Sequence, residues 1–149
     1  TLGNALTYAA ANTLDDYEEG TWSPQIYYQN STDQGNASNT TQTGLYTKIG
    51  RVVTVNFRLI WNISGSPATD NIGVKNLPFT GTGDTFSSAG TAFPINNSTT
   101  INTLLLGKPA SGGTLTIFES GDMVGNLGNK FGSGNNKEIR GTLTYFTSQ

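Results

Sequence analysis

The sequence contains no cysteine and no histidine among its 149 residues. Without cysteine, the chain cannot form disulfides, thiolate nucleophiles or zinc–thiolate sites. Without histidine, it lacks the commonest general base and the commonest transition-metal ligand, so Ser-His-Asp and Cys-His catalysis cannot be assembled from this chain. We therefore expect a protein that is not an enzyme and that holds no metal or other cofactor.

Charge is also scarce. Charged residues make up 12% of the chain, with a net charge of −2, which is about half the usual charged share. The eight Lys and Arg residues are scattered, so nucleic acid is not an expected partner. No apolar run approaches the roughly 20 residues of a membrane helix, and residues 1–14 lack a basic start and a continuous apolar block. We expect neither membrane insertion nor a signal peptide.

Glycine, asparagine, serine and threonine are abundant instead, with 19 glycines alone. Gly and Asn readily adopt the positive φ angles that turns need, so this composition favours short strands joined by turns. The length suits one domain. Hydrophobic residues make up 34% of the chain, enough for a modest core that neighbouring chains could complete.

The clearest strand is "RVVTVNFRLIW", residues 51–61, in which hydrophobic and polar side chains alternate. Thr54, Asn56 and Arg58 share the polar face, although Val52 and Ile60 at its two ends could contact another element or subunit. The alternation predicts a strand with one buried face. We expect Trp61 in the core rather than as a platform for sugar stacking, since it continues the hydrophobic face formed by Val53, Val55, Phe57 and Leu59.

Other segments show the same alternation of hydrophobic and polar residues. "TWSPQIYY" alternates Trp22, Ile26 and Tyr28, and Pro24 within it predicts an edge strand or a bulge. The closing segment "EIRGTLTYFT" places four residues on one face, namely Ile139, Gly141, Leu143 and Tyr145. About eight short strands with no credible helix among them predict an all-β fold, an antiparallel β-sandwich.

If each strand crosses the sandwich once, the two longest polar loops, within 29–43 and 120–138, lie together at the end opposite residue 21. Loops of that length are commonly functional, so we expect a ligand-binding surface there. Phe131 could contact a sugar beside Asn129 and Lys130, or could fold inward to close the end of the sandwich. The candidate binding residues are Asp33, Asn36, Asp70, Asn97, Asn129, Lys130 and Phe131.

The stretch "LDDYEEGTWSP", residues 14–24, carries the carboxylates Asp15, Asp16, Glu18 and Glu19. Paired carboxylates can hydrolyse glycosides, but no aromatic-lined cleft is expected around these. The D-x-D-x-D-G spacing of a calcium loop is missing as well, although a cation held between subunits stays open. We favour a junction, with residues 1–20 as a lead-in and residues 21–149 as the β-sandwich domain.

Four segments together resemble the C-terminal modules of tail fibres and tailspikes of tailed bacteriophages: "LDDYEEGTWSP", "GLYTKIGRVVTVNFRLIW", "NLPF" and "GTLTYFTSQ". The resemblance extends from Leu14 onward and is loose between Gly81 and Lys137. It implies a jelly-roll-like sandwich tip that follows a stem, assembles as a homotrimer and binds bacterial surface polysaccharide, or another surface receptor, without catalysis. It also implies a virion location on the tail fibre, outside the cell during attachment.

In this family setting the acidic stretch would mark the passage from stem to tip. Gly20 would release the chain, Trp22 would anchor the first strand, and Lys48 and Arg51 could pair with the carboxylates. Two alternatives stay open. One is a structural virion protein, such as a capsid decoration or head fibre, and the other is a tailspike that cleaves polysaccharide.

Overall fold

The computed structural model describes residues 16–28, 37–66, 72–82, 89–95, 104–106, 113–119 and 130–147. The fold is all-β with antiparallel sheets, as the alternation predicts. Within the described part, no helix has the length and apolar character needed to cross a membrane. The strands are β1 (Tyr17–Trp22), β2 (Gln25–Tyr28), β3 (Ala37–Ile49), β4 (Val52–Ile63), β5 (Ile72–Lys75), β6 (Ala89–Ile95), β7 (Leu104–Leu106), β8 (Leu115–Glu119) and β9 (Gly134–Phe146).

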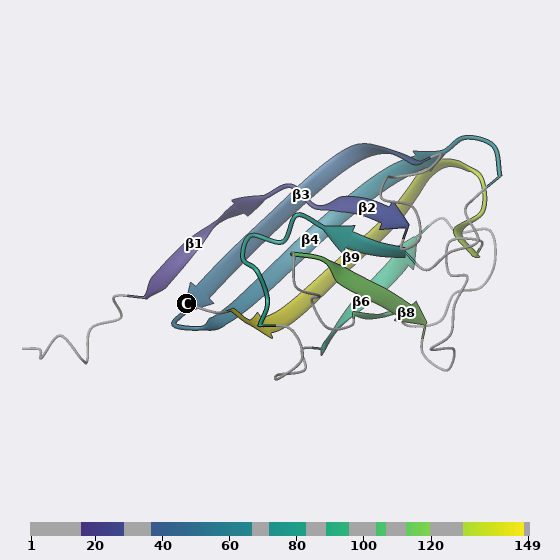
Figure 1. Ribbon diagram of the computed structural model, residues 1–149. Helices are drawn as coiled ribbons and strands as arrows, with labels where there is room; N and C mark the ends of the chain where they lie inside the picture. Colours follow the sequence, from purple (N-terminus) through teal and green to yellow (C-terminus); the bar gives the residue numbers. More distant parts are fainter. Residues whose placement is uncertain are drawn as a thin grey trace, which may run out of the picture.

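The strands form two layers (Figure 1). The larger layer has the order β1-β3-β4-β9-β6, and the smaller layer contains β8, β5 and β2. Strand β7 pairs with both β6 and β8 and so joins the layers on one side. On the other side the layers end at β1 and β2, which follow each other in the chain.

The open side of the sandwich is where the chain passes from one layer to the other, at Ser23 and Pro24. Strand β2 pairs only with β5, so it is an edge strand as Pro24 predicted. Two side chains of β3 connect the segment from Pro24 to Ile26 to the larger layer. Gln42 Nε2 donates to the Pro24 carbonyl oxygen at 2.8 Å, and Asn39 Oδ1 accepts from the Ile26 amide at 3.4 Å.

The core lies between the layers and contains the alternating side chains of both. All five residues expected on the buried face of β4 are buried, and so are Trp22, Ile26 and Tyr28. Both tryptophans therefore belong to the core, as expected. Burial of each large apolar side chain contributes about 1.5–3 kcal/mol before conformational entropy is subtracted.

Glycines on the inner face of the larger layer make room for aromatic rings on neighbouring strands. Gly20 lies opposite Tyr46, and Trp22 lies opposite Gly44. A Cβ added to Gly20 would meet the Tyr46 ring at 2.7–2.8 Å, and one added to Gly44 would overlap the Trp22 indole. Gly20 is therefore part of strand β1 and does not release the chain. The expectation of a break there is wrong, because the missing side chain serves packing.

The two ends of the sandwich differ. We call the end with Gly50 the base, since the tight β3–β4 turn and the end of β9 lie there. At the other end, which we call the distal end, Ala37 pairs with Ile63 and Ile63 with Gly134. Tyr28 pairs with Ile72 and Leu104 with Glu119, at the same end.

Candidate functional site

The connections that follow β2, β4, β6 and β8 all leave from the distal end. This placement follows from the register. The last residues of β2, β4 and β8 pair with the first residues of β5, β3 and β7, and the last residue of β6, Ile95, pairs with Glu138 in the distal part of β9. The count of strand directions from the sequence therefore holds, since each described strand crosses the sandwich once. The long polar segments are attached at one end of a rigid scaffold.

Most of the predicted binding residues lie outside the described residues. These are Asp33, Asn36, Asp70, Asn97 and Asn129. Lys130 is described and partly buried, shortly before β9 begins. Its place at the distal end agrees with the expectation, and its role in binding stays a prediction.

Phe131 is not a surface aromatic. Its side chain is fully buried, and its ring lies 4.9 Å from the Trp61 ring, measured between centroids. The interpretation as a sugar-contacting side chain is wrong, and the alternative of an inward-folded ring is right. Burial removes the ring from water, and Trp61 offers it an aromatic partner.

The outer face of the larger layer, away from the core, carries every exposed large hydrophobic residue of the described chain. Four of them form one row across β1, β3, β4 and β9 near the base, which we call the base stripe: Tyr17, Ile49, Val52 and Phe146. They are 50%, 50%, 39% and 37% exposed. Together these four side chains form one continuous apolar row on the sheet face.

A hollow of about 360 Å³ lies on the same outer face, farther from the base. One side is formed by Leu45, Asn56 and Thr142, and the other by Arg58 and Arg140, with further contributions from Thr43, Thr91 and Phe93. The floor includes Gly44, Phe57 and Gly141. These three residues are paired in the register, and at all three positions the side-chain direction is toward the core. This volume is at the low end of the range for small-molecule sites, about 300–1,000 Å³.

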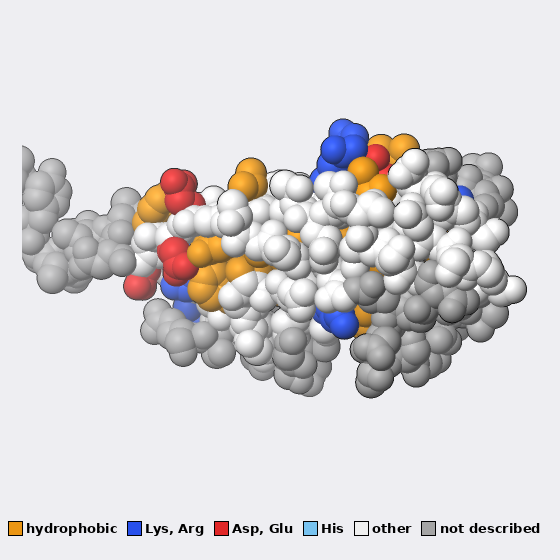
Figure 2. Space-filling model, turned by 90° about the horizontal axis from the view of Figure 1, so that it is seen from above, with side chains coloured by type: hydrophobic (Ala, Val, Ile, Leu, Met, Phe, Trp, Pro, Cys, Tyr) orange, Lys and Arg blue, Asp and Glu red, His pale blue; other side chains and the backbone are white. Residues whose placement is uncertain are grey.

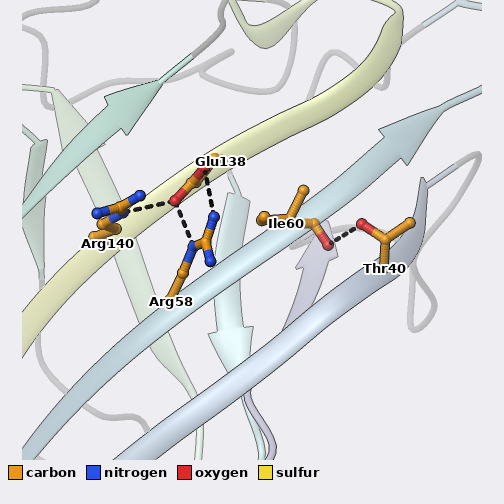
Figure 3. Close-up of polar contacts among 5 residues, drawn as sticks. All are labelled: Thr40, Arg58, Ile60, Glu138 and Arg140. Carbon is orange, nitrogen blue, oxygen red and sulfur yellow. Dashed lines mark hydrogen bonds and ion pairs between the residues drawn. The ribbon is translucent and has the colours of Figure 1, made fainter.

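Three charged residues at the edge of the hollow form a connected cluster (Figure 3). Glu138 Oε1 accepts from Arg58 Nε at 2.7 Å and from Arg140 Nε at 2.6 Å. Glu138 Oε2 accepts from Arg58 Nη2 at 3.4 Å. The side chain of Glu138 is only 10% exposed, whereas those of Arg58 and Arg140 are 47% and 56% exposed. The carboxylate thus lies beneath two guanidinium groups that face solvent.

The electrostatics of the cluster follow from these contacts. The hydrogen bond from Arg58 is the main cause that lowers the pKa of Glu138, and Arg140 adds to it against the effect of burial. The same pairing raises the pKa of Arg58. Glu138 is therefore ionised at neutral pH, and two positive charges meet one negative charge. One positive charge remains in excess at the hollow.

Asn56 and Thr142 supply neutral polar groups on the opposite side of the hollow. Thr142 Oγ1 donates to Asn56 Oδ1 at 2.7 Å. This bond occupies Asn56 Oδ1, and the Asn56 amide nitrogen makes no hydrogen bond to another described residue. The hollow therefore offers hydrogen-bond donors next to a positive charge.

The acidic stretch is part of strand β1, since the strand begins at Tyr17 rather than near Thr21. Glu18 and Glu19 are consecutive in the strand and point to opposite faces. Tyr46 donates to Glu18 Oε1, and Tyr17 donates to Glu19 Oε2, each at 2.6 Å. These hydrogen bonds raise the pKa of both tyrosines. The two carboxylates point away from each other, and this geometry does not suit a general acid and base acting on one bond.

Of the two expected basic partners of the acidic stretch, Lys48 lies beside it in the register but forms no ion pair with a carboxylate of the described residues. Lys48 is opposite Glu18 in the register, and its Nζ is 5.8 Å from the centroid of the Phe79 ring. Arg51 Nε donates to the Thr147 carbonyl oxygen at 3.1 Å. No group of three Asp, Glu, His or Cys residues is placed to hold a metal ion within the described ranges.

Sequence reasoning missed the hollow, although it placed Asn56 and Arg58 on the outward face of β4. The missing information was the register between β4 and β9. Arg58 pairs with Arg140, and Ile60 with Glu138, across a sequence separation of about 80 residues. Alternation shows which way a side chain points, but it does not show which distant strand lies beside it.

Comparison of the chain with protein-family models, with curated proteins and with solved structures found no match. Inference about function therefore rests on the chemistry and geometry of the described residues and on the family resemblance of the quoted segments.

Proposed function

We propose that this chain is the receptor-binding tip of a tailed-phage tail fibre, which attaches the virion to bacterial surface polysaccharide without cleaving it. The observation that carries the proposal is the convergence of four connections at the distal end of a two-layer β scaffold. Binding residues are commonly held on loops at one end of such a scaffold. The resemblance of the quoted segments to tail-fibre modules supports the same function and a location on the virion.

A homotrimer with a jelly-roll-like fold is part of this proposal, and we place contact between copies at the base stripe. Tyr17, Ile49, Val52 and Phe146 are half-exposed apolar neighbours in one row. Covering them would remove apolar surface from water, at about 25 cal/mol for each Å² buried. Their place at the base leaves the distal end open to a receptor.

Binding without catalysis is supported by the state of the described carboxylates. Glu138 is held by two arginines, which keep it ionised and occupy its oxygens, so it is a poor general acid. Glu18 and Glu19 face opposite sides of β1 and cannot flank one glycosidic bond.

Cell attachment tests the proposal. Fluorescently labelled full chain is incubated with a panel of encapsulated bacteria and their capsule-deficient mutants, and bound fluorescence is measured. We expect binding to at least one encapsulated strain and loss of binding to its capsule-deficient mutant. A variant with Asp33, Asn36, Asp70, Asn97 and Asn129 all changed to alanine should bind weakly. The control changes Thr47, Thr54 and Thr144 to alanine on the outer face and should bind normally. Failure to bind any strain contradicts the proposal.

Assembly is tested by light scattering of the same protein. The wild-type chain is expected to have the mass of a trimer, and Val52→Lys combined with Ile49→Lys is expected to give a monomer. Gln25→Lys on β2, in the smaller layer, is the matched control and should leave the mass unchanged. A monomeric wild-type chain would contradict the trimer.

The second candidate is a structural virion protein, because the base stripe equally suits packing against another virion component. Deleting the protein from virions separates the two functions, since a capsid decoration can be lost without loss of adsorption. A tailspike that cleaves polysaccharide is a weaker candidate. It would release new reducing ends from capsular polysaccharide, and we expect none.

A further inference from the structure

The hollow on the outer face plays no part in display at the distal end or in contact at the base stripe. It begins at the row that contains Asn56, four residues along β4 from Val52 in the base stripe, and reaches Arg58, two residues farther. At about 3.4 Å per residue, Arg58 is roughly 20 Å from the stripe. Contact between copies at the base can leave the hollow open.

We propose that this hollow binds an acidic sugar, with the sugar carboxylate held by Arg58 and Arg140 and the ring placed against Phe93 and Leu45. The inference rests on the proposed function in one respect: it names the chemical class of the surface polysaccharide. It assigns binding to a sheet face for which sequence reasoning named no site.

The charge of the hollow selects an anion. Both arginines donate from Nε to the same oxygen of Glu138, so the two guanidinium groups are fixed side by side. Arg140 uses only its Nε within the described part of the chain, and Arg58 uses Nε and Nη2. The remaining N–H groups can form charge-assisted hydrogen bonds to a carboxylate, for which a guanidinium has the matching planar geometry.

The walls of the hollow suit a sugar ring. Phe93 is 66% exposed and Leu45 is 56% exposed, so both offer apolar surface to a ligand. Phe93 pairs with Arg140 in the register, so the apolar ring and the positive charge are neighbours. Asn56, Thr91 and Thr142 add polar groups that can meet hydroxyls. A sugar acid combines an apolar ring face, hydroxyls and a carboxylate in one small molecule.

The arrangement of charges supports a specific site at the hollow. Figure 2 shows two places where basic, acidic and hydrophobic side chains lie together, one at the upper edge of the view and one at its left end. Burial of the Glu138 carboxylate carries a desolvation penalty. A function in orienting the two arginines toward a ligand accounts for a carboxylate at this position.

The experiment measures binding of free sugars to the isotope-labelled full chain by NMR titration at low ionic strength. The probes are glucuronate, galacturonate, mannuronate and N-acetylneuraminate, with glucose, galactose and mannose as neutral counterparts. We expect at least one acid to bind about tenfold more tightly than the neutral sugars, because hydrogen bonds to charged groups are stronger. The shifted amides should lie on β4, β6 and β9, and added salt should weaken binding.

Variants separate the charge from the apolar wall. Arg140→Gln leaves the Arg58–Glu138 pair but removes the excess charge, so affinity for the acid should fall about tenfold, to that of the neutral sugar. Phe93→Ala should weaken binding of acidic and neutral sugars alike. Lys75→Gln on β5 changes the net charge by the same amount away from the hollow and should have no effect. Retained thermal unfolding shows that each variant is folded.

Each outcome bears on the inference. It is overturned if no acid is preferred over its neutral counterpart, if the shifts lie elsewhere, or if an acidic peptide such as a glutamate trimer binds as tightly as the sugars. If the chain binds encapsulated cells while sugar acids leave the hollow unaffected, the inference fails and the proposed function stands. If sugar acids bind at the hollow while no cell is bound, the inference stands and the proposed function fails.

Discussion

The pairing of Gly44 with Trp22 gives the sharpest prediction about stability. A Cβ at position 44 would overlap the indole of Trp22, and the ring cannot simply move aside. Trp22 is 8% exposed and packs edge to face on Phe57, with 6.0 Å between ring centroids. Phe57 in turn lies over Gly141, where an added Cβ would meet its ring at 2.7 Å. Displacement of one ring therefore displaces the next.

Gly44→Ala should lower the free energy of unfolding by about 1–2 kcal/mol. Overpacking a core lowers stability by about 1–3 kcal/mol. Alanine also has less conformational freedom than glycine in the unfolded chain, which offsets about 0.4–1 kcal/mol of this loss. Urea unfolding followed by tryptophan fluorescence measures the change, and the midpoint should fall by roughly 0.5–1 M. The slope with urea should stay constant.

Gly20→Ala is the matched control for this prediction. Its neighbour Tyr46 is only partly buried, so its ring can swing toward solvent and relieve the overlap at lower cost. Trp22→Leu should rescue part of the loss in the Gly44→Ala background, because the two sites share one contact. Equal stability of Gly44→Ala and the wild type, within about 0.5 kcal/mol, would refute the packing argument.

Three further predictions concern single side chains. Tyr145→Phe should cost about 1–2 kcal/mol, because the Tyr145 hydroxyl donates to the Phe79 carbonyl oxygen at 3.0 Å. Burial raises the pKa of Tyr145 to about 12, so the stability that its neutral form contributes is present at neutral pH and is lost as the pH rises through that value. For Glu138 the pKa is lowered from 4.5, so its contribution is present at neutral pH and is lost as the pH falls through the lowered value. The wild type should therefore lose more stability on acidification than Glu138→Gln. Phe131→Ala should cost about 3–5 kcal/mol, since it opens a cavity beside Trp61.

Each of these has a direct measurement. Absorbance of tyrosinate in an alkaline titration should include a tyrosine with a pKa of about 12, and loss of that step in Tyr145→Phe identifies it. Unfolding of Glu138→Gln and the wild type between about pH 6 and pH 3 gives the acid dependence, and parallel curves would contradict it. For Phe131→Ala, unchanged stability would mean that the ring does not pack in the core.

The strands and their faces could be predicted from the sequence because alternation is local. The five buried residues of β4 and the inward Ile139, Leu143 and Tyr145 of β9 were all placed correctly. The shared end of the long connections followed from a count of strand directions, which needs no knowledge of which strands are neighbours.

The sequence was a poor guide where the function of a residue depends on its spatial neighbours. Gly20 looked like a break because glycine favours turns, but it provides space for Tyr46. For Phe131 the polar sequence neighbours left a surface position and a buried one both open, and only its spatial neighbour Trp61 decides for burial. The cluster of Arg58, Glu138 and Arg140 was out of reach because it depends on long-range pairing.

The opposed glycine and aromatic positions of β1 and β3 also fix how these two strands slide past each other. A shift of two residues in one direction would set Trp22 against Tyr46, and in the other direction Gly20 against Gly44, where no side chain fills the gap. A shift of one residue would turn Trp22 out into water. Only one register places a glycine opposite each aromatic ring. Among the described strands, β1 pairs with β3 alone, and this requirement still fixes its register.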